Sequence, residues 1–62
     1  MLTIHIKHNS LEIKGRMIED VIQILDKNNI EYVWSIGKIV INKEHSFDSL
    51  YLLSLKYDIE LI

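Results

Sequence analysis

The sequence contains no cysteine and no proline, and only two of its 62 residues are glycine. Without cysteine there is no disulfide framework, no thiolate metal site and no cysteine nucleophile. The two glycines, Gly15 and Gly37, stand in neither a GxGxxG nor a GKS/T context, so neither phosphate-binding loop is present. The chain also lacks a run of about 20 apolar residues, the length that a membrane-spanning helix needs. We therefore expect no membrane partner.

The N-terminus lacks a basic segment followed by an apolar one, so the sequence predicts no secretory signal and a cytoplasmic protein. Apolar residues make up 48% of the chain and charged residues 26%, with a formal net charge of −2. This composition is typical of a globular protein. A chain of this length predicts a single domain over residues 1–62.

The choice of residues also carries information about the gene. Alanine is absent and arginine occurs once, whereas isoleucine, lysine, asparagine and tyrosine are common. Residues with GC-rich codons are avoided, which favours a low-GC bacterium or one of its phages as the source.

The first fourteen residues alternate between apolar and polar side chains on both sides of a polar break at residues 7–10. A period of two is typical of a strand with one buried face. Two such runs joined by a short polar segment predict a β-hairpin, which ends at Gly15.

Between Arg16 and Asn28 the spacing of the apolar residues becomes helical. They occupy an arc of about 160° on a helical wheel, and polar residues fill the rest. Glu19 lies in the first turn and Lys27 in the last, as the helix dipole favours. Asn28 and its neighbour Asn29 tolerate the left-handed conformation that ends many helices. The sequence predicts a helix over 16–28.

A second alternating segment, residues 30–41, predicts a second hairpin. Gly37-Lys38 fits a two-residue turn of type II′, which has glycine first. This turn pairs Trp34 with Ile41 and places Trp34 in the core. Trp34 is thus predicted to be buried with Ile36 and Ile41 of the hairpin and with Ile22 of the preceding helix.

The last part of the chain predicts a second helix over Phe47–Tyr57, with Ser46 as its N-cap. Its apolar residues spread around most of the helical wheel. Phe47, Leu50 and Tyr51 form the arc expected to cover the sheet. Residues 58–62 predict either a short strand or a tail packed on the domain.

These elements predict an α+β fold of order ββαββα, with a short C-terminal strand as an option and an antiparallel sheet that carries both helices on one face. The two halves also match at a spacing of 28 residues. This spacing predicts a ββα quasi-repeat over 1–29 and 30–62, although any two amphipathic hairpin-helix units would match in the same way. The matching pairs include Leu11 with Ile39, Ile13 with Ile41, and Asp20 with Asp48.

Histidines and carboxylates form no recognisable catalytic or metal-binding set. His5 and His8 have HxxH spacing, but on a strand that runs into a turn they point to opposite faces. A zinc site needs three or four convergent ligands. Asp20 and Asp48 fit the starts of the two helices, where the dipole favours negative charge. We therefore expect a protein that is not an enzyme and has no metal or cofactor.

The second predicted helix leads to the preferred functional hypothesis. A helix that is apolar nearly all round must be covered on more than one side, and a single sheet covers only one. Self-association is a common source of additional stability for so small a chain. The sequence predicts a non-enzymatic protein-interaction module that forms a homodimer and binds a host protein, as a phage or mobile-element accessory protein would. The predicted interface comprises Leu52, Leu55, Ile59, Leu61 and Ile62.

Two alternatives stay open from the sequence. One is a small nucleic-acid-binding regulator that uses the basic side of the first hairpin, which carries His5, Lys7, Lys14 and Arg16. The negative net charge argues against this hypothesis, because contacts between basic residues and phosphates dominate the affinity for nucleic acids. The other alternative is a structural subunit that assembles with copies of itself.

Overall fold

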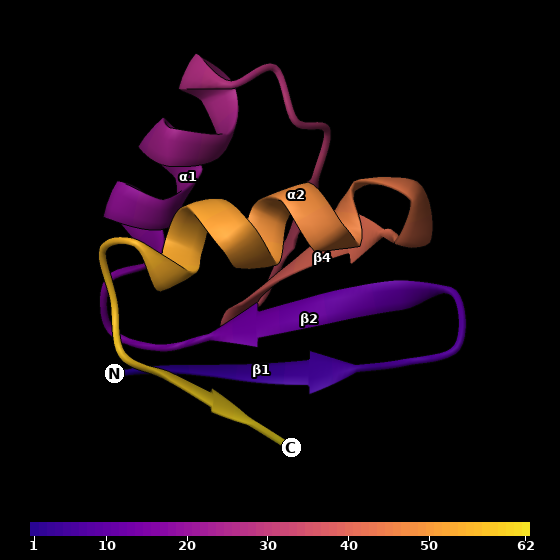
Figure 1. Cartoon of the computed structure of the whole chain (residues 1–62), viewed down its shortest axis with the longest axis horizontal. Coiled ribbons are helices and arrows are strands. Elements are labelled where there is room, and N and C mark those ends of the chain that lie inside the picture. Colours follow the sequence, from indigo (N-terminus) through magenta and orange to yellow (C-terminus); the bar gives the residue numbers. More distant parts are fainter.

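The computed structural model describes every residue from Met1 to Ile62 and contains five strands and two helices (Figure 1). The predicted α+β class and element order are confirmed, and residues 59–61 form the optional last strand. Neither helix has the length and apolar character that a membrane crossing requires. Along the chain the elements are β1 (Leu2–Ile6), β2 (Ser10–Lys14), α1 (Ile18–Lys27), β3 (Val33–Ser35), β4 (Lys38–Asn42), α2 (Lys43–Ser54) and β5 (Ile59–Leu61).

The five strands form one sheet in the order β3-β4-β2-β1-β5. All neighbouring strands are antiparallel except β5, which pairs parallel to β1. The sheet is therefore mostly antiparallel, as predicted, and mixed only at the edge that the last strand forms. Because β4 and β5 run in the same direction on opposite sides of β1 and β2, the chain must cross the sheet between them. The helix α2 makes this crossing.

Both helices lie on the same face of the sheet, as predicted (Figure 1). The helix α2 packs on β2 and β4, and α1 packs beside α2. The opposite face of the sheet carries no helix (Figure 1). The core between the layers consists of ten buried apolar residues, namely Leu2, Ile4, Leu11, Ile13, Val21, Leu25, Ile30, Ile39, Ile41 and Leu53.

The helix α1 agrees with the prediction to within two residues at each end. Asn29 adopts the left-handed conformation, with φ 57°. The Ile30 N–H then donates to the Leu25 carbonyl at 2.9 Å, and the Asn29 N–H donates to the Asp26 carbonyl at 3.2 Å. This pair of bonds is the Schellman arrangement, which closes the helix and turns the apolar residue after it inward. Ile30 joins the core for this reason.

The second hairpin has a different register from the predicted one. Ser35 pairs with Lys38, and Trp34 pairs with Ile39, so the turn is Ile36-Gly37. Gly37 has a φ of 74° at the second turn position, whereas Ile36 does not have a positive φ. A type II′ turn requires the positive φ at its first position, so the predicted turn type is wrong.

The prediction that Trp34 and Ile36 belong to the core is also wrong. Trp34 is 62% exposed, and Ile36 is fully exposed in the turn. Trp34 shares the helix-covered face with Ile39, its buried partner across the hairpin. It stands on the edge strand next to the turn, where it lines a shallow hollow with Arg16 and Met17 at the start of α1.

The helix α2 begins at Lys43, three residues before the predicted N-cap Ser46. It follows β4 without a loop, with Asn42 as its N-cap, and the Lys43 N–H donates to the Asn9 carbonyl at 3.1 Å. Ser46 lies within the first turn, where its Oγ donates to the Lys43 carbonyl at 2.8 Å. The direct connection determines which side of α2 faces the sheet.

That side carries Ser49 and Leu53, both fully buried. Phe47 is 83% exposed and Tyr51 is 62% exposed, so the prediction that these two rings cover the sheet is wrong. A serine is tolerated at the close contact because the Ser49 Oγ donates to the His45 carbonyl at 2.7 Å. This bond satisfies the hydroxyl within the helix.

Candidate interaction site

An apolar groove with a volume of about 380 Å³ lies between α2 and β5. All of its lining residues but one are hydrophobic. The lining residues are Phe47, Leu50, Tyr51, Ser54, Ile59 and Leu61.

The groove follows directly from the two elements that form it. Its four helical residues have the spacing i, i+3, i+4 and i+7, which places them on one side of α2. In β5, Ile59 and Leu61 share one side of the strand because side chains alternate. Ile59 pairs with Leu2, and Leu61 pairs with Ile4. Since Leu2 and Ile4 are core residues, the groove side of β5 faces the helices.

Large apolar side chains remain in water around this groove. Phe47 and Tyr51 are the exposed members on α2, and Leu61 is the exposed member on β5. Leu55, immediately after α2, and Ile62, immediately after β5, are also exposed, but Ile62 alternates with Leu61 and falls on the helix-free side of the strand. A cluster of this kind on a small domain is typical of a surface that another molecule covers.

The structure places the five predicted interface residues in three settings. Ile59 and Leu61 line the groove. Leu55 and Ile62 are exposed and do not line the groove. Each directly follows one of the two elements that form it, α2 and β5. Leu52 is half-buried and packs against the core, so it offers less surface than the sequence suggested.

Sequence reasoning missed the two rings of the groove. The sequence assigns Phe47 and Tyr51 to the sheet-covering side because they share a helical arc with Leu50. Asn42 is as good an N-cap residue as serine, and it comes directly after the last alternating residue of the hairpin. An N-cap at Asn42 predicts a helix that follows the second hairpin without a loop.

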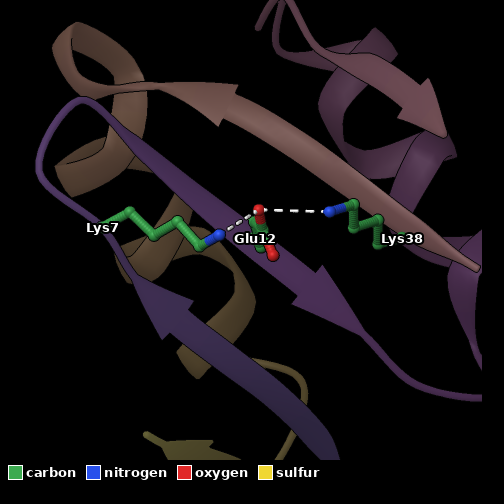
Figure 2. A network of polar contacts seen from close by, with 3 residues as sticks. All are labelled: Lys7, Glu12 and Lys38. Carbon is green, nitrogen blue, oxygen red and sulfur yellow. Dashed lines mark hydrogen bonds and ion pairs between the residues drawn. The ribbon is translucent and has the colours of Figure 1, made fainter.

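The opposite face of the sheet carries a buried carboxylate. Glu12 in β2 has a side chain only 9% exposed, and one of its oxygens lies 3.0 Å from the Lys7 Nζ and 3.3 Å from the Lys38 Nζ (Figure 2). The hydrogen bond from Lys7 lowers the pKa of Glu12, the bond from Lys38 adds to this effect, and desolvation opposes it. The pKa of Glu12 therefore lies below its ordinary value. Two of the lysines on this face share this one carboxylate.

The residues predicted for the nucleic-acid alternative are only partly brought together. Lys14 pairs with Thr3, and His5 pairs with Glu12, so both belong to the helix-free face that Lys7 reaches. Arg16 lies beyond the end of β2 and lines the hollow beside Trp34. The exposed Trp34 is on the other face of the sheet. The structure thus separates the lysines from the ring on which a base would stack.

A wider hollow of about 500 Å³ lies beside the segment that joins α1 to β3. Its lining is mainly polar and includes Asp26 and Glu31 next to Tyr32. Burial, followed by the carboxylate of Asp26, raises the pKa of the Tyr32 hydroxyl. Ligand sites are mostly apolar with a few polar groups, so the groove between α2 and β5 fits that description better than this hollow.

No group of three or more histidine, aspartate and glutamate side chains is arranged to hold a metal ion. No family model, no curated protein and no solved structure matches this chain. The functional proposal therefore rests on the geometry of the groove.

Proposed function

We propose that this chain is a non-enzymatic protein-interaction module that binds a partner protein through the groove between α2 and β5. The observation that supports the proposal is the exposure of Phe47 and Tyr51 over an apolar groove. Covering apolar surface contributes about 25 cal/mol for each Å² removed from water. Aromatic residues of this kind often supply much of the free energy of a protein–protein interface.

The partner is proposed to be a host protein in the cytoplasm, and the chain an accessory protein of a phage or mobile element. The support for this part is the composition, which lacks alanine and contains a single arginine. Such a composition suits an AT-rich gene.

Self-association through the same surface is the competing proposal. Leu55, exposed immediately after α2, would extend the contact between two copies. Sedimentation of the isolated chain separates the two cases, because a homodimer forms without any other protein and a module for a different partner stays monomeric.

The experiment compares two double variants of the tagged chain in the cells that naturally make it. Phe47→Ser with Tyr51→Ser removes the rings from the groove, and we expect it to abolish capture of the partner. Val33→Ser with Ile36→Ser is the matched control, since both residues are exposed at the opposite edge of the sheet. We expect the control to capture the partner as the wild type does.

Both double variants change exposed residues, so their free energies of unfolding should differ from that of the wild type by no more than about 1 kcal/mol. Urea denaturation checks this condition. Capture that survives loss of both groove rings, or that is lost equally in the control, would contradict the proposal.

A further inference from the structure

The outer edge of β5 has free backbone groups. The Leu2 N–H donates to the Asp58 carbonyl at 2.9 Å, and the Ile62 N–H donates to the Ile4 carbonyl at 3.0 Å. In a strand, the backbone groups of alternate residues point to the same side. The backbone groups of residues 58, 60 and 62 therefore face β1, and those of residues 59 and 61 face away. Because β5 is the last strand of the sheet, no strand pairs with residues 59 and 61 on that side.

The side chains of β5 divide between the two faces of the sheet. Ile59 and Leu61 line the groove on the helix-covered face. Glu60 pairs with Thr3 and lies on the helix-free face. No ion pair in the structure involves Glu60. A strand added along this edge would thus meet an apolar groove on one face and an unpaired carboxylate on the other.

We propose that the β5 edge binds an extended segment of a partner protein as a sixth strand. Two apolar residues of that segment enter the groove, and the basic residue between them lies opposite Glu60. This proposal rests on the proposed function, because it uses the same groove. Backbone hydrogen bonds to Ile59 and Leu61 hold the segment, and side chains at alternate positions select it.

Charge argues against a second copy of this chain as the occupant. Two β5 strands could pair antiparallel so that Ile59 and Leu61 of both copies exchange backbone bonds. That register places the two Glu60 side chains directly opposite each other. Like charges at directly opposite positions destabilise a strand pair, whereas opposite charges stabilise it. A register shifted toward the N-terminus would bring Asp58 against Glu60 and repeat the conflict.

The variant Glu60→Lys is a probe for this edge that needs no knowledge of the natural partner. In a mixture with the wild-type chain, its lysine lies opposite Glu60 in the same register. We expect a 1:1 heterodimer with a Kd lower by about threefold to thirtyfold than the Kd for self-association of either chain alone. Sedimentation measures the stoichiometry and the Kd. Hydrogen exchange at the backbone amides of Ile59 and Leu61, followed by NMR in the labelled wild-type chain, should slow only in the mixture.

Glu31→Lys is the matched control, because it changes the net charge equally and lies in the loop before β3 at the other edge of the sheet. Equal association of the wild type with both lysine variants would overturn the added strand. So would a wild-type homodimer that protects the Ile59 and Leu61 amides, because the occupant would then be a second copy. If the mixture fails to associate while capture of a partner still depends on Phe47, the added strand is wrong and the proposed function stands.

Discussion

The two hairpin-helix units of the molecule, β1-β2-α1 and β3-β4-α2, share a register but differ in their surroundings. The pairing of Ile6 with Leu11 in the first hairpin recurs 28 residues later as the pairing of Trp34 with Ile39. The inner strands β2 and β4 then pair antiparallel at the centre of the sheet. An approximate two-fold relation between the hairpins produces this arrangement. A common origin for the two ββα units stays a prediction.

The position of a strand in the sheet explains which side chains are buried. Ile4 in β1 is fully buried, whereas Tyr32, its counterpart 28 residues later, is half-buried. The first hairpin is flanked by strands on both sides, and β3 lies at an edge. However, Ile6 and Trp34 are both more than half exposed. Their exposure therefore depends more on their shared position next to a hairpin turn than on the identity of the side chain.

The two helices differ more than the two hairpins. A loop separates β2 from α1, so α1 can turn its apolar side to the core. No loop separates β4 from α2, and the strand therefore determines the rotation of the helix. Phe47 and Tyr51 face water as a result. The direct connection to β4 thus leaves Phe47 and Tyr51 beside β5, where they line the candidate groove.

The largest effect is expected from the equivalent core residues of the two inner strands. Ile13 and Ile41 are both fully buried. Ile13→Ala and Ile41→Ala should each lower the free energy of unfolding by about 2–5 kcal/mol, because each removes buried methylene groups and leaves a cavity. Urea denaturation measures the loss.

Either alanine variant could unfold so small a domain, so the valine variants provide the comparison. Ile13→Val and Ile41→Val should each cost about 0.5–1.5 kcal/mol. If the free-energy losses of the two valine variants differ by more than about 1 kcal/mol, the width of that range, the two units contribute unequally to the core.

A smaller effect is expected at the centre of the helix-free face, where the units carry different residues. Glu12 in the first unit corresponds to Val40 in the second, and the two pair across β2 and β4. The pKa of Glu12 is lowered from 4.5, so its ion pairs with Lys7 and Lys38 stabilise the fold above about pH 4.5. That contribution is lost as the pH falls through the lower, folded-state pKa.

The variant Glu12→Gln keeps the shape of the side chain and removes its charge. Its free energy of unfolding should lie below that of the wild type near pH 7, and the difference should shrink as the pH falls below about 4.5. Urea denaturation at a series of pH values measures both curves. A difference that stays constant with pH would mean that the ion pairs contribute no stability.

The parts of the fold that could be predicted are those where the spacing of apolar residues is compatible with only one secondary structure and register. The first hairpin and α1 belong to this class, because the period of the apolar residues changes clearly at Gly15. The second hairpin does not. Moving its turn by one residue shifts the pairing by two, which leaves every side chain on the same face. Alternation cannot distinguish these registers, and Gly37 suits both turns.

The candidate site divides in the same way. Ile59 and Leu61 could be predicted because they are apolar residues in a segment that alternates outside the two hairpin-helix units. The rings Phe47 and Tyr51 could not be placed, because apolar residues lie around most of the helical wheel of α2 and the pattern does not single out the side that faces the sheet. The parallel pairing of β5 with β1 also depends on tertiary contacts that no local pattern encodes.

The smallest effect is expected at the two exposed positions next to the hairpin turns. Trp34→Ala and Ile6→Ala should each change the free energy of unfolding by no more than about 1 kcal/mol, because more than half of each side chain is already in water. Urea denaturation, with Ile13→Ala as the reference for a core position, measures both changes. A loss at Trp34 as large as the loss at Ile13, with Ile6→Ala still mild, would mean that the tryptophan packs on the start of α1 more tightly than its exposure indicates. The equivalence of the two turn positions would then fail, and the second unit would have a packing contact that the first unit lacks.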